Sequence, residues 1–455
     1  MMTIPLFEAF VAIGGRTNRQ ISPLDYVNFV TQNSKEVKKG TLFVALTGQR
    51  VDGHDFVKEA ETLGAIAAVV ERDVNDVSIP QFIVPSTVKA MGDLAKIWRG
   101  RLAIPVVAVT GSVGKTSTKE LIAHVLEAKY RTHKSRKNFN NQLGVPIELM
   151  NLDRSHQCSV VEFGMRNFNQ INYLSWIARP NIAVITNIGM SHIETLGSRE
   201  NIAKAKAEIL EGMDREGTLI LNRDDDFYEY IRSLSHCNVI SFGENSRADI
   251  RLSDIQLNEK ANPSFKLNGL PVVMTNCVGK HHAYNAAIAY AVAIQLGIRQ
   301  EDIASRLATF STPDRRGSFS YAKNGALLLD STYNAAPDSI KASLYTISEL
   351  TKRGKRTIAV IGEMLELGTH SEEAHRHIGK IISEMIEVEL LVTVGEYARF
   401  IGEEAHKPDW KHFENATAAA RYLVDEIRSD DIVLLQGSNG VSLDIVVNAL
   451  EKGAL

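Results

Sequence analysis

The chain has 455 residues, of which 44% are hydrophobic and 23% are charged, and its formal net charge is −3 at pH 7. A chain of this length is expected to form two to four domains, each with its own core. The slight negative charge argues against a protein that wraps nucleic acid or binds an anionic membrane, because both need a basic excess.

Signals of export and of membrane insertion are missing from the sequence. The N-terminal "MMTIPLFEAFVAIGG" lacks the basic start and the long apolar run of a signal peptide, and no run of about eighteen apolar residues occurs. Cys158, Cys237 and Cys277 are odd in number and far apart, which predicts neither a disulfide framework nor a zinc site. We expect a cytoplasmic monomer without membrane insertion and without a nucleic-acid partner.

Short apolar strands and one helix are predicted in the N-terminal part. The strands are "TLFVAL", "AIAAVVE" and "QFIVP", and the helix is "TVKAMGDLAKIWRGRL". A new pattern then begins with "VVAVT", "SVVEF", "NIAVITNIG" and "GTLILN", which alternate with helical stretches. Such alternation favours parallel strands joined by crossover helices.

The pattern changes again further along the chain. Residues 248–278 predict antiparallel hairpins at a sheet edge, and "HHAYNAAIAYAVAIQLG" predicts a helix that stops at Gly297. After Pro313 the strands "ALLLD", "TIAVIG", "LLVTVG" and "DIVLLQG" are again interleaved with helices. We therefore expect an α/β protein of three domains, with bounds at 1–101, 102–313 and 314–455.

A glycine-rich turn between the strand "VVAVT" and the helix that follows it predicts a phosphate site. The usual phosphate-binding loop has a glycine, four free positions and then Gly-Lys-[Ser/Thr]. Here only two residues separate Gly111 from Gly114, and Val109 stands where the first glycine is usual. Amides of such a turn form an anion-binding nest at a helix N-terminus. Lys115 would reach the outer phosphates of a nucleotide, and Thr116 would bind Mg²⁺.

Two further residues are candidates because of where they stand, and a third, Lys206, is not indicated by its position. Glu162 ends the strand "SVVEF" and His192 follows the strand "NIAVITNIG", so both lie beyond carboxyl ends of strands, where ligands bind in open α/β sheets. Each also has an ordinary interpretation: Glu162 as a solvated charge at the end of a strand, and His192 as a structural hydrogen-bonding group. Lys206 lies in a probable helix, "ENIAKAKAEIL", where composition alone predicts a solvated face.

Taken together, "TGSVGKTS", "EFGM", "TNIGMSHIETLGS" and "AKAKAEIL", in this order, resemble the ATP-dependent Mur ligases of peptidoglycan synthesis. The resemblance covers nearly the whole chain and explains the shortened loop as the family's own. It implies a central P-loop ATPase domain with a parallel sheet, flanked by an N-terminal domain that binds a UDP-linked substrate and a C-terminal Rossmann-like domain. The cofactors would be ATP and Mg²⁺.

Four other stretches are similar to one branch of that family. They are "LFVALTGQRVDGHDF", "KNFNNQLGVP", "LDSTYNAAPDSIKASL" and, most specifically, "AVIGEMLELGTHSEEAH". They resemble ligases that join D-alanyl-D-alanine to UDP-N-acetylmuramoyl-tripeptide through an acyl phosphate. The alternatives are a relative that adds a diamino acid to the dipeptide, a P-loop ATPase switch that makes no bond, and a scaffold that has lost its chemistry.

The resemblance also implies roles for individual residues. The ATP phosphates would be held by Gly111, Ser112, Val113, Gly114, Lys115, Thr116 and Ser117, and the rest of the nucleotide by Asn285, Arg316 and Asp330. The catalytic and metal-binding set would be Lys115, Thr116, Glu162, His192 and Lys206, the last matching a lysine that relatives carry as a carbamate. The UDP-linked substrate would be held by Ser34, Lys35, Thr47, Asn138, Asn140 and Asn141.

The sequence departs from the family's pattern at several positions of the second and third domains. Ser331 and Ala336 replace an acidic residue and an asparagine, and Gln436 and Asn439 replace a lysine and an arginine. The usual His-Asn pair reads His281-His282. These changes affect expected nucleotide and peptide contacts and leave the phosphate loop intact.

Overall fold

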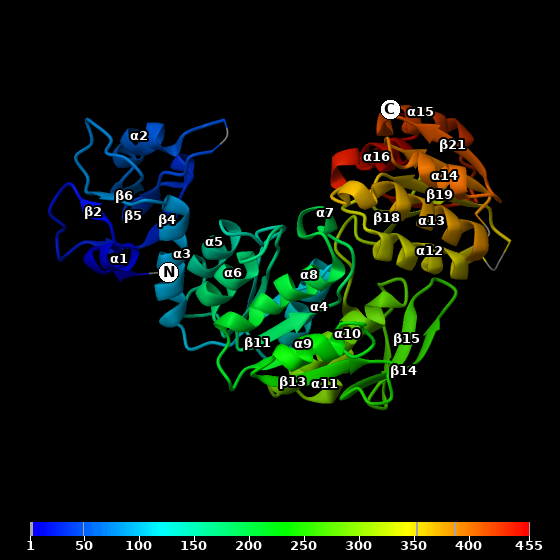
Figure 1. Cartoon of the computed structure of the whole chain (residues 1–455), viewed down its shortest axis with the longest axis horizontal. Coiled ribbons are helices and arrows are strands. Elements are labelled where there is room, and N and C mark those ends of the chain that lie inside the picture. Colours follow the sequence, from blue (N-terminus) through cyan, green and yellow to red (C-terminus); the bar gives the residue numbers. More distant parts are fainter. Residues whose placement is uncertain (1–2, 49, 352–353, 386–387, 455) are drawn as a thin grey trace.

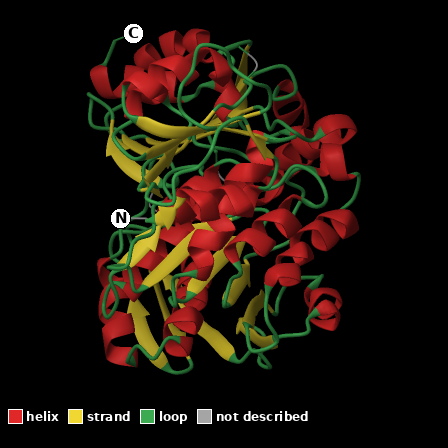
Figure 2. Cartoon of the chain, turned by 90° about the vertical axis from the view of Figure 1, so that its left-hand side faces the viewer, coloured by secondary structure: helices red, strands yellow, loops and turns green. Residues whose placement is uncertain are grey.

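The structure is a computed structural model that describes residues 3–48, 50–351, 354–385 and 388–454. Figure 1 shows three α/β parts that follow one another along the chain, each built around its own sheet. Strands lie between layers of helices, as seen in the view coloured by secondary structure (Figure 2). Among the described helices, none has the length and apolar content needed to cross a membrane.

The N-terminal part contains a five-stranded sheet of order β2-β7-β6-β5-β4 and a small sheet of β1 and β3. The three predicted strands and the predicted helix are confirmed, whereas the first helix was not predicted. The elements are β1 (Ile4–Pro5), α1 (Leu6–Ile13), β2 (Arg16–Thr17), β3 (Tyr26–Val27), β4 (Phe29–Thr31), η1 (Ser34–Glu36), β5 (Thr41–Val44), η2 (Gly53–Phe56), α2 (Val57–Thr62), β6 (Ala65–Val70), β7 (Gln81–Ile83) and α3 (Thr87–Gly100).

The middle part contains a nine-stranded sheet of order β16-β15-β14-β13-β12-β11-β8-β10-β9. Its first elements are β8 (Val106–Thr110), α4 (Lys115–Leu126), β9 (Thr132–Lys134), α5 (Gly144–Met150), β10 (Cys158–Glu162), α6 (Gln170–Ala178), β11 (Ile182–Ile185), α7 (Ile193–Leu196), α8 (Arg199–Ala207) and η3 (Glu208–Gly212). It continues with β12 (Thr218–Asn222), α9 (Tyr228–Leu234), β13 (Asn238–Gly243), β14 (Ile250–Leu257), β15 (Pro263–Leu267), β16 (Leu270–Val273), α10 (His281–Gln295) and α11 (Gln300–Thr309).

Strand β8 runs through the middle of this sheet and is buried on both faces, as its unbroken apolar sequence predicts. Val107 and Val109 pack into one core with residues of α4 and α10, while Val106 and Ala108 pack into the core on the opposite face. The neighbours of β8 are β10 and β11, both parallel to it. The predicted hairpins at the edge are confirmed, because β15 pairs antiparallel with both β14 and β16.

Helix α3 ties the N-terminal part to the middle one. It packs against α5 and α6. The Trp98 indole donates a hydrogen bond to the Leu152 carbonyl at 2.8 Å, and Arg99 Nε donates to the Ala178 carbonyl at 2.9 Å. Both side chains are buried, so these bonds fix the orientation of α3 on the middle part.

The C-terminal part contains a six-stranded sheet of order β17-β18-β22-β19-β20-β21, parallel except for β17. The four predicted strands are confirmed, and the edge strands β17 and β21 were not predicted. The elements are β17 (Ser318–Tyr321), β18 (Leu327–Ser331), α12 (Pro337–Thr351), β19 (Thr357–Gly362), η4 (Gly368–His370), α13 (Ser371–Met385), β20 (Leu390–Val394), α14 (Arg399–Glu404), β21 (Asp409–Phe413), α15 (Ala416–Glu426), β22 (Ile432–Gln436), η5 (Asn439–Val441) and α16 (Asp444–Lys452).

Candidate active site

The glycine-rich turn lies at the carboxyl end of β8, directly before α4. The chain leaves β8 toward β9 and β10 on one side and later places β11 on the other side. Such a reversal of strand order opens a crevice at the carboxyl ends of the strands. Gly111 and Gly114 have φ angles of 151° and 84°, which only glycine adopts without strain. The sharp turn therefore depends on both glycines.

The loop is shaped by the segment that follows β11. The backbone amides of Ser112 and Val113 donate to the carbonyl and the side-chain oxygen of Asn187, each at 3.0 Å. The Thr186 hydroxyl donates to the Val113 carbonyl at 2.6 Å, and the Gly189 amide donates to the Ser112 hydroxyl at 2.8 Å. These bonds fix the conformation of the turn. Thr186 and Asn187 were not predicted as functional, although both lie in a stretch that carries the family resemblance.

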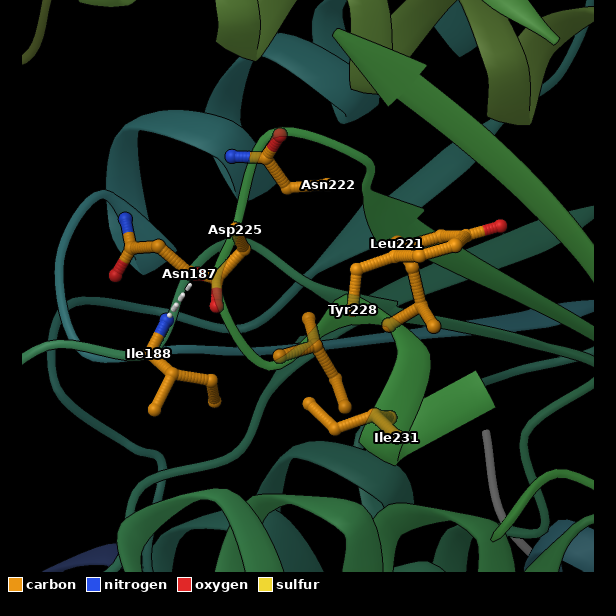
Figure 3. A pocket seen from close by; sticks show the side chains of 8 residues that line it. Asn187, Ile188, Leu221, Asn222, Asp225, Tyr228 and Ile231 are labelled. Atoms are coloured by element: carbon orange, nitrogen blue, oxygen red, sulfur yellow. Dashed lines mark hydrogen bonds between the residues drawn. The ribbon is translucent and has the colours of Figure 1, made fainter. Parts of the chain in front are cut away.

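Asp225 in turn holds that shaping segment. Its carboxylate accepts a hydrogen bond from the Ile188 amide at 2.8 Å, drawn as the dashed line in Figure 3. Figure 3 also shows the apolar side chains of Leu221 and Ile231, which line the same small pocket as Asp225. Burial raises the pKa of Asp225. Asp225 therefore supports the phosphate loop indirectly, by holding the backbone of Ile188 next to Asn187.

Lys115 folds back over the loop. Its ammonium donates to the Gly111 carbonyl at 2.7 Å and to the Ser112 carbonyl at 3.3 Å. Removal of water lowers the pKa of Lys115, and the charge of Arg316 adds to that effect. Because the first turn of a helix has amides without intrahelical acceptors, α4 presents its N-terminal amides together with this lysine. The arrangement suits an anionic phosphate group.

Thr116 of α4 contacts Glu162 at the carboxyl end of β10. The Thr116 hydroxyl donates to Glu162 Oε2 at 2.7 Å, and the Asn140 amide donates to Glu162 Oε1 at 2.9 Å. Glu162 is only 2% exposed and is paired in register with Val109 of β8. The interpretation of Glu162 as a solvated strand-end charge is therefore wrong. Asn140, expected to touch the UDP-linked substrate, lies against the expected metal ligand.

His192 contacts a residue of the C-terminal part. Its Nδ1 lies 2.7 Å from Oε2 of Glu366, whose Oε1 lies 3.4 Å from Arg166 Nη2. Glu366 belongs to the loop after β19, and it was not predicted as a site residue although it lies in the stretch "GEMLELG". Both His192 and Glu366 have positive φ angles, 67° and 63°. Strained backbone in two residues that touch is typical of functional sites.

Lys206 lies on α8 with 1% of its surface exposed, so the prediction of a solvated face is wrong. It forms no hydrogen bond or ion pair with the part of the chain that the structure describes. Burial lowers the pKa of Lys206 well below its usual value, and the nearby charge of Lys115 lowers it further. This downward shift of the pKa favours the neutral form of the amine over the ammonium.

The expected nucleotide residues come from both sides of the crevice. Asn285 of α10 accepts a hydrogen bond from the Thr118 hydroxyl at 3.1 Å. The Arg316 guanidinium lies 3.8 Å from the centre of the Tyr333 ring, and burial lowers the pKa of Arg316. Asp330 accepts hydrogen bonds from the amide and hydroxyl of Thr332, and within the described residues it forms none to the middle part.

The remaining substrate candidates lie on two parts of the chain. Ser34 and Lys35 form the turn η1, and the Lys35 amide donates to the Asn33 side chain at 3.1 Å. Thr47 forms an isolated bridge with Asp52. These residues form no hydrogen bond with the phosphate loop among the residues described.

Asn138 and Asn141 lie in the segment before α5, and α5 packs against β4. The Asn141 side chain accepts hydrogen bonds from the Leu143 and Gly144 amides at 3.1 Å and 2.8 Å, while the Asn138 carbonyl accepts one from Asn140. The structure therefore gives Asn141 a role in shaping the start of α5.

The oxygen atoms at Thr116 and Glu162 fit Mg²⁺. In the described residues no three His, Cys, Asp or Glu side chains form a group that suits a metal ion. Mg²⁺ does not need such a cage, because it is usually held by one or two carboxylates, waters and substrate phosphates. A hydroxyl and a carboxylate beside a phosphate loop supply that set.

Comparison with known proteins agrees with this geometry. Three family models match: "Mur ligase family, catalytic domain" at residues 26–99, "Mur ligase middle domain" at 109–293 and "Mur ligase, glutamate ligase domain" at 315–439. A UDP-N-acetylmuramoyl-tripeptide–D-alanyl-D-alanine ligase of Bacillus subtilis is 33% identical, with 94% of each chain covered. The ligase of that name from Escherichia coli is 32% identical, with 93% of each chain covered.

Solved structures show the same fold over the whole chain. MurF from Acinetobacter baumannii matches with a TM-score of 0.91 at 31% identity and covers 99% of both chains. MurF from Thermotoga maritima in complex with ADP matches with a TM-score of 0.85 at 29% identity, covering 94% of this chain and 98% of that one. The predicted three-part α/β architecture is confirmed, and the chain belongs to the Mur ligase family, in its MurF branch.

Proposed function

We propose that this chain is an ATP-dependent ligase that joins D-alanyl-D-alanine to UDP-N-acetylmuramoyl-tripeptide, a step of peptidoglycan precursor synthesis. The observation that carries the proposal is the phosphate loop with Lys115 beside the Thr116–Glu162 pair, in a chain similar over its whole length to ligases of that name. A relative that adds a diamino acid to the dipeptide is not favoured by these similarities.

The reaction needs an activated carboxylate, because a free carboxylate has a poor leaving group for attack by an amine. The γ-phosphoryl group of ATP is transferred to the terminal carboxylate of the tripeptide, which gives an acyl phosphate and ADP. The amine of the dipeptide attacks the acyl carbon, and the tetrahedral intermediate expels phosphate as the amide forms. Catalysis of phosphoryl transfer is mostly positioning and stabilisation of negative charge.

Lys115 and the amides at the start of α4 are suited to hold the transferring phosphoryl group. Thr116 and Glu162 would hold Mg²⁺, which neutralises charge on the phosphates when bound. His192 and Lys206 would hold a second metal ion, with Lys206 converted to a carbamate. The burial of the Lys206 amine supports that conversion, because only a neutral amine attacks CO₂.

The nucleotide would be bound by Gly111–Ser117 together with Asn285, Arg316 and Asp330. The Thermotoga maritima relative was solved in complex with ADP, which supports nucleotide binding by this chain. Arg316 and Asp330 come from the C-terminal part, so they reach the same nucleotide only if that part closes over the middle one. We propose domain boundaries near residues 102 and 313, supported by the separation of the three sheets along the chain.

The UDP-linked substrate would be held by the N-terminal residues Ser34, Lys35 and Thr47 with Asn138, Asn140 and Asn141. The bond from Asn140 to Glu162 supports this, because it links the expected substrate segment to the expected metal site. We place the protein in the cytoplasm as a monomer. Free Cys158, Cys237 and Cys277 support a reducing compartment.

Phosphate release from ATP tests the proposal when each co-substrate is omitted in turn. Release only with both the UDP-linked tripeptide and D-alanyl-D-alanine, with a product heavier by one dipeptide residue unit, is the expected result. Release with neither co-substrate would identify an ATPase switch. Product only from the dipeptide substrate and a diamino acid would identify the neighbouring ligase, and no release in any mixture would identify a scaffold without chemistry.

A further inference from the structure

The cations at the candidate active site pose a problem for the second substrate. Burial lowers the pKa of Lys115, and the charge of Arg316 lowers it further; burial and the charge of Lys115 lower the pKa of Lys206 in the same way. An acceptor dipeptide enters this region with a positively charged ammonium group, which Lys115 and Arg316 repel. A carboxylate that faces the site is needed to bind it.

The carboxylates near the phosphate loop differ in whether their oxygens and their charge are already matched by other side chains. Both oxygens of Glu162 are occupied, by Thr116 and Asn140. Asp338 approaches Gly189 from α12, and its charge is offset by the cations Arg199 and Lys341. Glu366 is 44% exposed at its side chain, and its charge reaches the Lys115 ammonium. Glu366 is therefore both accessible and close to the phosphate loop.

The two oxygens of Glu366 have different partners. Oε2 is held by His192 Nδ1 at 2.7 Å. Oε1 faces Arg166 Nη2 at 3.4 Å, a separation longer than a good hydrogen bond, and the Arg166 side chain is 74% exposed. A cation thus already lies at Oε1, but it is loosely held on a long, solvated side chain that is easily displaced.

The loop that carries Glu366 is anchored by hydrogen bonds to α13 and to the segment after β22. The Met364 amide donates to His375 Nε2 at 2.9 Å, and the Leu365 amide donates to the Ser438 hydroxyl at 2.9 Å. His375 is buried, and its Nδ1 lies 2.6 Å from the Ser371 carbonyl. The strained φ of Glu366 is maintained by these bonds, which aim its carboxylate at the middle part.

We propose that Glu366 binds the ammonium group of the acceptor dipeptide at Oε1, in place of Arg166, while His192 holds Oε2. This inference rests on the proposed ligase function and assigns the acceptor a residue of the C-terminal part. Before attack, the bound ammonium releases one proton to solvent, which frees the nitrogen lone pair for the acyl carbon. Amide formation would then also require the C-terminal part to be closed on the middle one, because the acceptor's binding group and the phosphate loop lie on different parts.

Glu366→Gln is the first variant to test, because it keeps the shape and a hydrogen-bond acceptor for His192 but removes the charge. Loss of a charged hydrogen bond predicts a rise of about 10- to 100-fold in the KM for D-alanyl-D-alanine. Formation of the acyl phosphate, trapped chemically without the acceptor, should stay near the wild-type level, as should the KM for ATP. Arg166→Gln should leave the acceptor KM unchanged or lower it, and Glu403→Gln on α14 is the neutral control.

A direct binding measurement removes the dependence on turnover. With ADP and the UDP-linked tripeptide present, wild-type protein should bind D-alanyl-D-alanine more tightly than N-acetyl-D-alanyl-D-alanine, which has no ammonium. Glu366→Gln should abolish that difference. Thermal unfolding of Glu366→Gln and Glu366→Asp checks that both variants are folded.

Three other outcomes of these experiments would overturn the inference. An unchanged acceptor KM in Glu366→Gln rules out an ammonium contact, and an equal loss of acyl-phosphate formation shows that Glu366 acts through His192. A raised acceptor KM in Asp338→Asn alone moves the ammonium to α12. If the wild-type protein makes no amide at all, the proposed function fails instead, so the two failures are distinguishable.

Discussion

Gly111 lies so close to Thr186 that a Cβ atom on Gly111 would be well under 3.0 Å from the Thr186 hydroxyl oxygen. That hydroxyl also donates to the Val113 carbonyl. The strand β11 and the phosphate loop are therefore packed against each other with no room for a side chain. This contact explains why the shortened loop keeps its first glycine at position 111, two residues closer to Gly114 than the usual pattern does.

Gly111→Ala is expected to abolish nucleotide binding. The new methyl group must push Thr186 away, and the φ of 151° is strained for alanine. Both effects change the conformation of the loop, so its backbone amides no longer point at the phosphates. Calorimetric titration with ADP measures the loss. Gly100→Ala is the matched control, because a Cβ at Gly100 of α3 would meet nothing within 4 Å. Wild-type ADP affinity in Gly111→Ala would show that the loop is not the nucleotide site.

Lys115→Ala should lower the ligation rate by at least about 100-fold, the scale for losing one well-placed donor. Its ammonium bonds only to carbonyls of its own loop among the described residues, so the fold should persist. Steady-state kinetics and circular dichroism together measure this. Exposed Lys407→Ala is the control. Turnover near the wild-type level would contradict the role of Lys115.

Glu162→Gln should raise the Mg²⁺ concentration needed for half-maximal ligation. The amide keeps an oxygen for Thr116 but removes the charge that favours a divalent cation. A Mg²⁺ titration at saturating ATP measures the shift, with Glu403→Gln for comparison. An unchanged Mg²⁺ requirement would mean that Glu162 serves only to position Thr116 and Asn140.

Local sequence was enough to predict the strands that lead into the site, because β8, β10, β11 and β12 are buried parallel strands with near-continuous apolar runs. The edge strand β21, "DWKHF", was missed because an exposed edge carries polar residues without a clear pattern. Helix α1 was missed because its start at Pro5 has no side-chain cap.

The contacts of the site were less predictable than its residue types. The pairing of His192 with Glu366 depends on how two sheets are placed, which no local pattern encodes. The burial of Lys206 was missed for a similar reason, because the face of α8 that turns inward is decided by the neighbouring helices. Sequence motifs therefore identified which residues matter better than they identified what those residues touch.

The adjacent His281 and His282 predict that stability falls in mild acid. Burial lowers the pKa of His281 to about 4 and that of His282 well below its usual value. Neither ring nitrogen of His282 has a hydrogen-bond partner within the described chain. As pH falls from about 6.5 toward about 4, the unfolded chain takes up protons that the folded chain refuses, so the free energy of unfolding decreases.

Replacing these histidines should flatten that dependence. His282→Asn removes one titrating group, and the double variant with His281→Asn removes both. Urea midpoints at about pH 7.5 and about pH 5 measure the change. Exposed His406→Asn should keep the wild-type pH dependence. A double variant that loses as much stability in acid as the wild type would show that other groups cause the decline.

Lys206 should react with CO₂ to form a carbamate. The neutral Nζ attacks the carbon of CO₂, a new N–C bond forms, and one proton is released, which leaves an anionic oxygen pair. The product is favoured here because it replaces a buried, unpartnered amine with a group that pairs with nearby cations such as Lys115. Protein incubated with ¹³C-bicarbonate should show a carbamate carbon resonance.

Two variants show whether that resonance belongs to Lys206. Lys206→Arg replaces the amine with a guanidinium that cannot form the adduct, so the resonance should disappear and ligation should fall. Lys204→Arg is the matched control on the same helix, because Lys204 is exposed while Lys206 is buried. If the resonance survives in Lys206→Arg, another amine carries the adduct. If the wild type shows none at saturating bicarbonate, Lys206 acts as a neutral amine, and the second metal ion loses its anionic ligand.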